Sequence, residues 1–217
     1  MSFSKHLNYH LSSHVANDLG NMLSFNRHSL QDPFKISLCG VDYEHPLWKA
    51  LYKSFHSTLD FIHHTESSYL DLCSERSNLV YITSLEKKFS LEYDPNATYI
   101  MAAVSEKDMQ TDFITPKLKK LNITRQGIPI DKHILWNQGS KRLNLNTKLK
   151  ILNDIRSNKE WKEILLEYLH PDNIKTKEQI MSEDIYRSRV TKHQEKKHKN
   201  KKNRIQSPKS HLNPFSN

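Results

Sequence analysis

Four short apolar segments alternate with segments of helical spacing along the first 170 residues. The apolar segments predict buried strands and are FKISLCGV (34–41), NLVYIT (78–83), ATYIMAAV (97–104) and TRQGIPI (124–130). Apolar residues recur at helical spacing over residues 46–63, 116–123, 145–157 and 159–169, and a short helical turn is expected at 85–89. Continuous apolar strands that alternate with helices indicate an α/β fold in which helices cover both faces of a parallel sheet.

The chain is predicted to have three regions. Residues 1–30 form a helical lead-in, residues 31–171 form the α/β domain, and residues 172–217 form a basic tail in which a frayed helix passes into disorder. No apolar segment approaches the roughly 20 residues that a membrane span needs, so no membrane partner is expected.

The net charge of +9 is concentrated in the tail. Residues 186–217 contain ten lysines and arginines and one acid, Glu195, so residues 1–185 sum to zero. Within that neutral part, residues 117–150 contain nine basic residues and one acid, Asp131. This distribution favours a polyanionic partner, most simply nucleic acid, over the alternative of a solvated face with a solubilising tail.

Several classes of site are disfavoured. The chain has only four glycines and no GxGxxG, so a Rossmann dinucleotide site is not expected. The two cysteines, Cys39 and Cys73, match no metal or disulfide framework. His6, His10 and His14 share a predicted helix face, but no cysteine or carboxylate completes a ligand set, so no metal site is predicted.

Candidate chemistry gathers where the predicted strands end. Ligands of parallel sheets bind outside the carboxyl ends of the strands. Three loops follow strands here, at residues 83–84, 102–109 and 128–131. In the second loop, two alanines precede a charged cluster that includes Glu106 and Asp108. We therefore expect the three loops to converge on one site.

Six segments together carry a family resemblance. They are NRHSLQDPFKISLC (26–39), VYIT (80–83), YIMAAVSEKDMQ (99–110), KLKKLNITRQGIPIDKHILW (117–136), GSKRLNLNTKLKIL (139–152) and NKEWKEIL (158–165). With them, residues 17–170 resemble the SPOUT-class methyltransferases that modify N1 of the purine at position 9 of tRNA. The similarity is greatest to the branch that serves as the methyltransferase subunit of protein-only mitochondrial ribonuclease P.

The resemblance implies a SPOUT fold with a C-terminal trefoil knot and S-adenosylmethionine as the cofactor. The positions that would bind the cofactor are Ile82, Thr83, Ala102, Ala103, Met109, Ile128 and Pro129, with Leu143 and Leu145 closing the pocket. Family members usually have glycine where Ala102 or Ala103 stands, because glycine lets the backbone approach the cofactor.

The resemblance also implies the catalytic residues. Glu106 stands where the family has an aspartate that acts as general base or orients the purine, and Asp108 is a possible substitute for it. N1 of guanine must lose a proton as the methyl group arrives, which a positioned carboxylate assists by about 10²–10⁴-fold. N1 of adenine already offers a lone pair and needs only positioning. The longer glutamate leads to the hypothesis that the protein favours adenine or methylates slowly.

The implied partners are tRNA, a short-chain dehydrogenase subunit and a metal-dependent nuclease subunit of ribonuclease P. The residues expected to grip RNA are Lys117, Lys119, Lys120, Arg125, Lys141 and Arg142. The family branch implies a mitochondrial location, with nucleus or cytoplasm as the alternative. A second possible function is a tRNA-binding scaffold of the same complex with weakened methyl transfer, because glycine and aspartate are replaced at the expected site.

Overall fold

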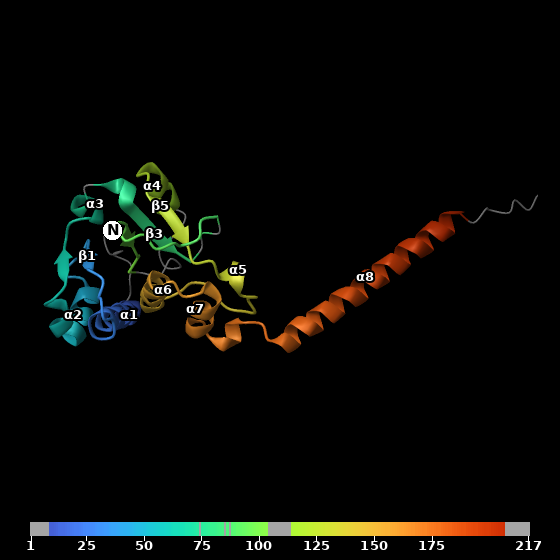
Figure 1. Ribbon diagram of the computed structural model, residues 1–217, viewed down its shortest axis with the longest axis horizontal. Helices are drawn as coiled ribbons and strands as arrows, with labels where there is room; N and C mark the ends of the chain where they lie inside the picture. Colours follow the sequence, from blue (N-terminus) through green and yellow to red (C-terminus); the bar gives the residue numbers. More distant parts are fainter. Residues whose placement is uncertain (1–8, 74, 85, 87, 104–113, 207–217) are drawn as a thin grey trace, which may run out of the picture. The chain divides into compact units, whose positions relative to one another are not determined.

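Two small parallel sheets form the centre of the fold in the computed structural model, which describes residues 9–73, 75–84, 86, 88–103 and 114–206 (Figure 1). Strand β1 (Ser37–Cys39) pairs with β2 (His63–Thr65). Strand β3 (Leu79–Thr83) lies between β4 (Thr98–Ile100) and β5 (Thr124–Gly127). All pairings are parallel, so the predicted α/β class with parallel strands is confirmed, although the described strands form two sheets where one was expected.

Helices cover both faces of the β4-β3-β5 sheet. On one face, β3 places Leu79 and Tyr81 in a cluster with Leu118 of α4 (Ile114–Lys120), and residues of α3 (Tyr69–Leu72) pack against it. On the other face, residues that follow β4 pack against a cluster formed by α1 (Tyr9–His28), α2 (Pro46–Leu59) and α6 (Leu145–Arg156). Figure 1 shows α4 on one side of β3 and β5, and α1 and α6 on the other.

Helix α7 (Trp161–Tyr168) is joined to α6 through a buried carboxylate. Asp154 of α6 accepts a hydrogen bond from the Tyr168 hydroxyl at 2.7 Å and forms an ion pair with Lys159 at 3.1 Å. Burial, the hydrogen bond to Asp154 and the nearby carboxylate charges raise the pKa of Tyr168 above its ordinary value. A short helix, α5 (Ile130–His133), follows β5 directly.

Some predicted boundaries differ from those in the structure. The helix expected to reach residue 63 ends at Leu59, and His63–Thr65 forms strand β2, because its backbone pairs with β1. No helical turn occurs at the described residues 86, 88 and 89, since Phe89 and Leu91 pair with Gly127 of β5. The strands expected over 97–104 and 124–130 are shorter, and Ile130 already begins α5.

The chain divides into two units, residues 1–173 and 174–217. The second unit contains α8 (Lys177–Gln206), a continuous helix where the sequence predicted a frayed one. The division into lead-in, domain and tail remains a prediction. Among the described residues, no helix is both long enough and apolar enough to cross a membrane.

Candidate active site

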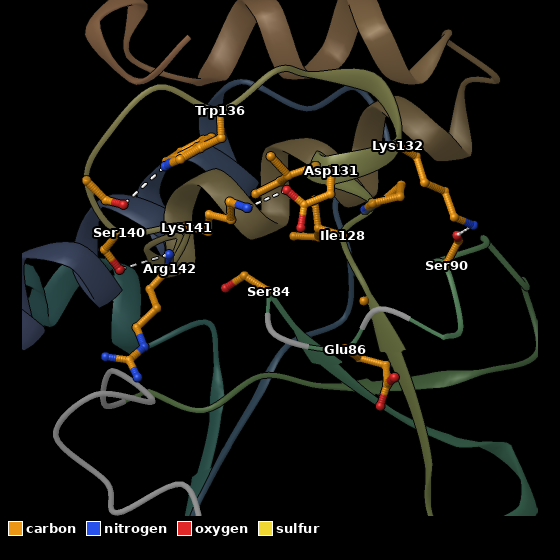
Figure 2. Close-up of a pocket in the computed structure, with 14 residues that line it drawn as sticks. Ser84, Glu86, Ser90, Ile128, Asp131, Lys132, Trp136, Ser140, Lys141 and Arg142 are labelled. Carbon is orange, nitrogen blue, oxygen red and sulfur yellow. Dashed lines mark hydrogen bonds and ion pairs between the residues drawn. The ribbon is translucent and has the colours of Figure 1, made fainter. Parts of the chain in front are cut away.

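A cavity of about 450 Å³ lies beside the carboxyl ends of β3 and β5 (Figure 2). Its walls come from three parts of the chain. These are the residues after β3, the segment from the end of β5 through the start of α5, and the segment that leads into α6. Parallel strands place ligand sites at this end of a sheet, as the sequence predicted.

Backbone hydrogen bonds hold the three segments together. The N–H of Ile128 donates to the carbonyl of Thr83 at 3.1 Å, which joins the ends of β5 and β3. The N–H of Leu143 donates to the Ser84 hydroxyl at 3.3 Å, which brings the segment before α6 to the same point. The predicted convergence of the loops after β3 and β5 is therefore present in the structure.

Gly127 allows a close backbone approach at the wall of the cavity. A Cβ atom at this position would lie 1.9 Å from the carbonyl oxygen of Glu86, closer than any real contact. The N–H of Gly127 donates to the carbonyl of Phe89, and its own carbonyl accepts from the N–H of Leu91, both at 2.7 Å. Only glycine leaves room for the segment that starts at Glu86 to pass so close to β5.

Charged groups of both signs surround the cavity. Asp131 and Lys141 form an ion pair across it, and Lys132 donates to the Ser90 hydroxyl at 2.6 Å (Figure 2). Arg125 pairs with Glu86 at 2.9 Å. Groups of both signs thus lie at the cavity, and Asp131, Lys141 and Glu86 are held in ion pairs.

An aromatic wall is held in place at the cavity. The indole N–H of Trp136 donates to the carbonyl of Gly139 at 3.1 Å, and the ammonium of Lys141 lies 5.8 Å from the ring centre. Trp136 is half-buried and lines the cavity. A fixed aromatic face of this kind can pack against a flat ligand ring.

The residues expected to bind the cofactor lie in three places. Ile128 and Pro129 line the cavity, and Thr83 and Leu143 make the hydrogen bonds that frame it. The Ile82 side chain is fully buried beneath them. Ala102, Ala103 and Leu145 instead line a second cavity of about 660 Å³, which is largely apolar and lies between β1 and β4.

The residues expected to bind RNA also differ from one another. Lys119 and Lys120 are exposed on α4, as a phosphate contact requires. Arg125 and Lys141 are instead paired with carboxylates, and Arg142 lines the cavity. The side chain of Lys117 lies outside the described residues, as do Glu106, Asp108 and Met109.

Sequence reasoning did not single out several residues of the cavity wall. Asp131 lies in the loop at 128–131 that the rule for strand ends places at the site, although no role was assigned to its side chain. Glu86 and Ser90 reach the cavity because residues 86 and 88–91 pass beside Gly127. No pattern in the sequence indicated that path.

A family model described as tRNA (guanine(9)-N(1))-methyltransferase TRM10/TRM10A matches residues 1–174, and this range includes all three segments around the cavity. The chain belongs to this family. The family assignment made from the six sequence segments is thereby confirmed.

Curated relatives support the assignment. The chain is 28% identical over 163 residues to tRNA methyltransferase 10 homolog C of Homo sapiens, which covers 73% of this chain and 40% of that protein. It is 24% identical over 165 residues to the mitochondrial ribonuclease P protein 1 homolog of Drosophila melanogaster, covering 74% and 36%. The chain thus spans about two fifths of the length of the curated relatives it matches.

Solved structures share the fold. The crystal structure of spTrm10(74) superposes with a TM-score of 0.65 at 20% identity, covering 77% of this chain and 90% of that one. A dual-specific Trm10 from Thermococcus kodakaraensis superposes with a TM-score of 0.52 at 17% identity, covering 75% and 92%. These likenesses establish that this chain has the fold of Trm10 proteins.

Proposed function

We propose that this protein transfers a methyl group from S-adenosylmethionine to N1 of the purine at position 9 of tRNA. The observation that carries the proposal is the family match over residues 1–174, which includes every described segment that frames the cavity. The same family supports a SPOUT fold with a trefoil knot formed by the C-terminal part of the domain.

The cavity suits the proposed cofactor. Its volume of about 450 Å³ falls within the range of about 300–1,000 Å³ typical of small-molecule sites. Ile128, Pro129 and Trp136 offer apolar surface for an adenine ring, while the paired Asp131 and Lys141 offer partners for an amino-acid group. A structure of the full-length spTrm10 has been solved as a complex with SAH, with 20% identity, a TM-score of 0.64 and coverage of 76% of this chain and 88% of that one.

The bound cofactor would supply an electrophilic methyl group. We propose that Thr83, Ile128, Pro129 and Leu143 hold the cofactor, and that Ile82, Ala102, Ala103, Met109 and Leu145 support or complete its site. For a guanine substrate, the Glu106 carboxylate would accept the N1 proton, and Asp108 would be the alternative acceptor. For adenine, Glu106 would orient the base without accepting a proton.

Exposed lysines would hold the RNA. Lys119 and Lys120 are exposed at the C-terminal end of α4, which precedes the first residue of β5. Contacts of such lysines with backbone phosphates offset the cost of drawing a base out of the tRNA core, which is a few kcal/mol. Lys117, Arg125, Lys141 and Arg142 would add to the same positive surface.

We further propose that the protein acts in mitochondria as a subunit of a ribonuclease P complex. The support is the similarity to a protein named mitochondrial ribonuclease P protein 1 homolog. The other subunits would be a short-chain dehydrogenase and a metal-dependent nuclease. Copurification of tagged protein from mitochondria, followed by a tRNA 5′-processing assay, tests this assignment.

The test of the enzymatic function uses purified protein, labelled S-adenosylmethionine and two tRNA transcripts, one with A9 and one with G9. Methylation is mapped at N1 for the wild type and for Glu106→Gln. We expect transfer to at least one transcript. Loss of transfer only to G9 in the variant would identify Glu106 as the base, whereas transfer to A9 alone would make it an orienting group.

A scaffold without efficient transfer is the second candidate. It is favoured by the alanines at 102 and 103, which line the second cavity and pack against core residues, and by the glutamate at 106. Tight tRNA binding with no methylation of either transcript would establish the scaffold and exclude the enzyme.

A further inference from the structure

Helix α6 begins at the segment that closes the proposed cofactor cavity, and a distant carboxylate caps it. We infer that Asp18, on helix α1, is a positioning residue for cofactor binding, because it fixes the start of α6. This inference rests on the proposed function, since it assigns a role toward the cofactor of that same site.

The first three N–H groups of α6 each have an acceptor. Such groups lack partners within their own helix. The side chain of Asn144 accepts from the N–H of Thr147 at 2.8 Å, which is an ordinary local cap. Asp18 Oδ2 accepts from the N–H of Leu145 at 2.8 Å, and Asp18 Oδ1 lies 3.5 Å from the N–H of Asn146. Asp18 thus caps a helix that begins 127 residues later in the chain.

Asp18 can act as a fixed anchor because α1 is tightly packed. Its neighbours Leu19 and Leu23 are buried in the main core cluster. Gly20 packs so closely on α2 that an added Cβ atom would lie 2.2 Å from the Phe55 ring. The carboxylate therefore stands on a helix that has little freedom to follow a displaced α6.

The capped residues adjoin the cavity directly. Leu143, two residues before the capped N–H of Leu145, donates its own N–H to Ser84 on the cavity wall. Arg142 lines the cavity itself. Without Asp18, two N–H groups at the start of α6 lose their acceptor, and the segment from 142 to 146 loses its hydrogen bonds to α1. The cofactor would then bind to a site that is ordered for only part of the time.

A comparable set of hydrogen bonds at the other end of α6 provides the control. Arg156 donates to the backbone carbonyl of Asp32 at 2.7 Å and to its carboxylate at 3.2 Å. This contact also joins α6 to the chain before β1, but it lies at the C-terminal end of the helix, away from the cavity-closing segment. Losing it should lower stability without disturbing the site.

The experiment measures the affinity of the full-length protein for S-adenosylhomocysteine by titration calorimetry, well below the unfolding temperature. Asp18→Ala is expected to weaken binding by about five- to tenfold, in keeping with the loss of one helix cap. Asp18→Asn, which keeps one acceptor oxygen, should weaken it less than about threefold. Arg156→Ala should leave it within about twofold.

Equal affinities for Asp18→Ala and Arg156→Ala would overturn the inference. If Asp18→Ala does not fold by circular dichroism, Asp18→Glu decides, because it keeps the charge and displaces the acceptor by one methylene. Weakening of at least threefold supports the positioning role, and wild-type affinity overturns it. Failure of the wild-type protein to bind S-adenosylhomocysteine would instead contradict the proposed function.

Discussion

Single residues at the cavity separate into those that shape its wall and those that offer charge. Gly127 belongs to the first kind, because the Glu86 carbonyl occupies the space that any Cβ atom would need. Arg125 was expected to bind phosphate, yet it pairs with Glu86 at the same place. The sequence identified Arg125 as a candidate but not Gly127, and the Glu86 contact that defines their roles depends on the path of residues 86 and 88–91.

Replacing Gly127 with alanine should destabilise the protein by about 2–3 kcal/mol, because either the Glu86 backbone or β5 must move. Urea denaturation followed by circular dichroism measures the change. A loss within about 0.5 kcal/mol, the usual range for a surface substitution, would contradict the proposed wall.

The paired and unpaired basic residues should differ in how they affect tRNA binding. Replacing exposed Lys119 with alanine should lower the slope of log affinity against log salt by about 1, as loss of one phosphate contact does. Arg125→Ala should change that slope less, because its charge is already balanced by Glu86. Filter binding across a salt series measures both, and equal slopes would argue against the distinction.

At the scale of elements, long patterns were predicted better than short ones. The helices at α2, α6 and α7 and the strand β3 were expected from apolar spacing, and each is present. Strand β2 was missed because His63–Thr65 is only three residues long and carries no apolar signal. It exists through its pairing with β1, which depends on contacts distant in sequence. The predicted strands at β4 and β5 were too long, because the end of a strand also depends on where its pairing with a distant neighbour stops.

The contact between α6 and α7 should weaken in alkali. The pKa of Tyr168 is raised above its ordinary value of 10.0, first by burial and then by Asp154, so the folded state holds this proton more tightly than the unfolded state. The stabilisation is complete below pH 10 and decreases as the pH rises beyond it. Tyr168→Phe should therefore lose less stability than the wild type between pH 9 and pH 11 in urea denaturation. Parallel curves for the two proteins would contradict this assignment.

At the scale of the whole molecule, the excess of positive charge and the proposed cofactor cavity lie in different units. The unit of residues 174–217 contains twelve basic and four acidic residues, whereas the cavity lies in the unit of residues 1–173. The positive tail could be predicted from composition, and the family from six motifs. The segment around Glu106 lies outside the described residues, and its catalytic role stays a prediction from the resemblance.

Removing residues 174–217 should weaken tRNA binding and leave cofactor binding unchanged. Affinity for tRNA is expected to fall roughly tenfold or more at moderate salt, because many phosphate contacts are lost. Affinity for S-adenosylhomocysteine should not change, because every residue of the cavity wall is retained. Weaker cofactor binding in the shortened protein would show that the tail contributes to the site.

The most direct test of the account is hydrogen exchange of the wild-type protein with and without S-adenosylhomocysteine. We predict slower exchange in the three segments that frame the cavity, at residues 83–84, 127–131 and 139–146, with no comparable change at β1 and β2. Binding accompanied by protection elsewhere, and none in these three segments, would contradict the assignment of the cavity as the cofactor site.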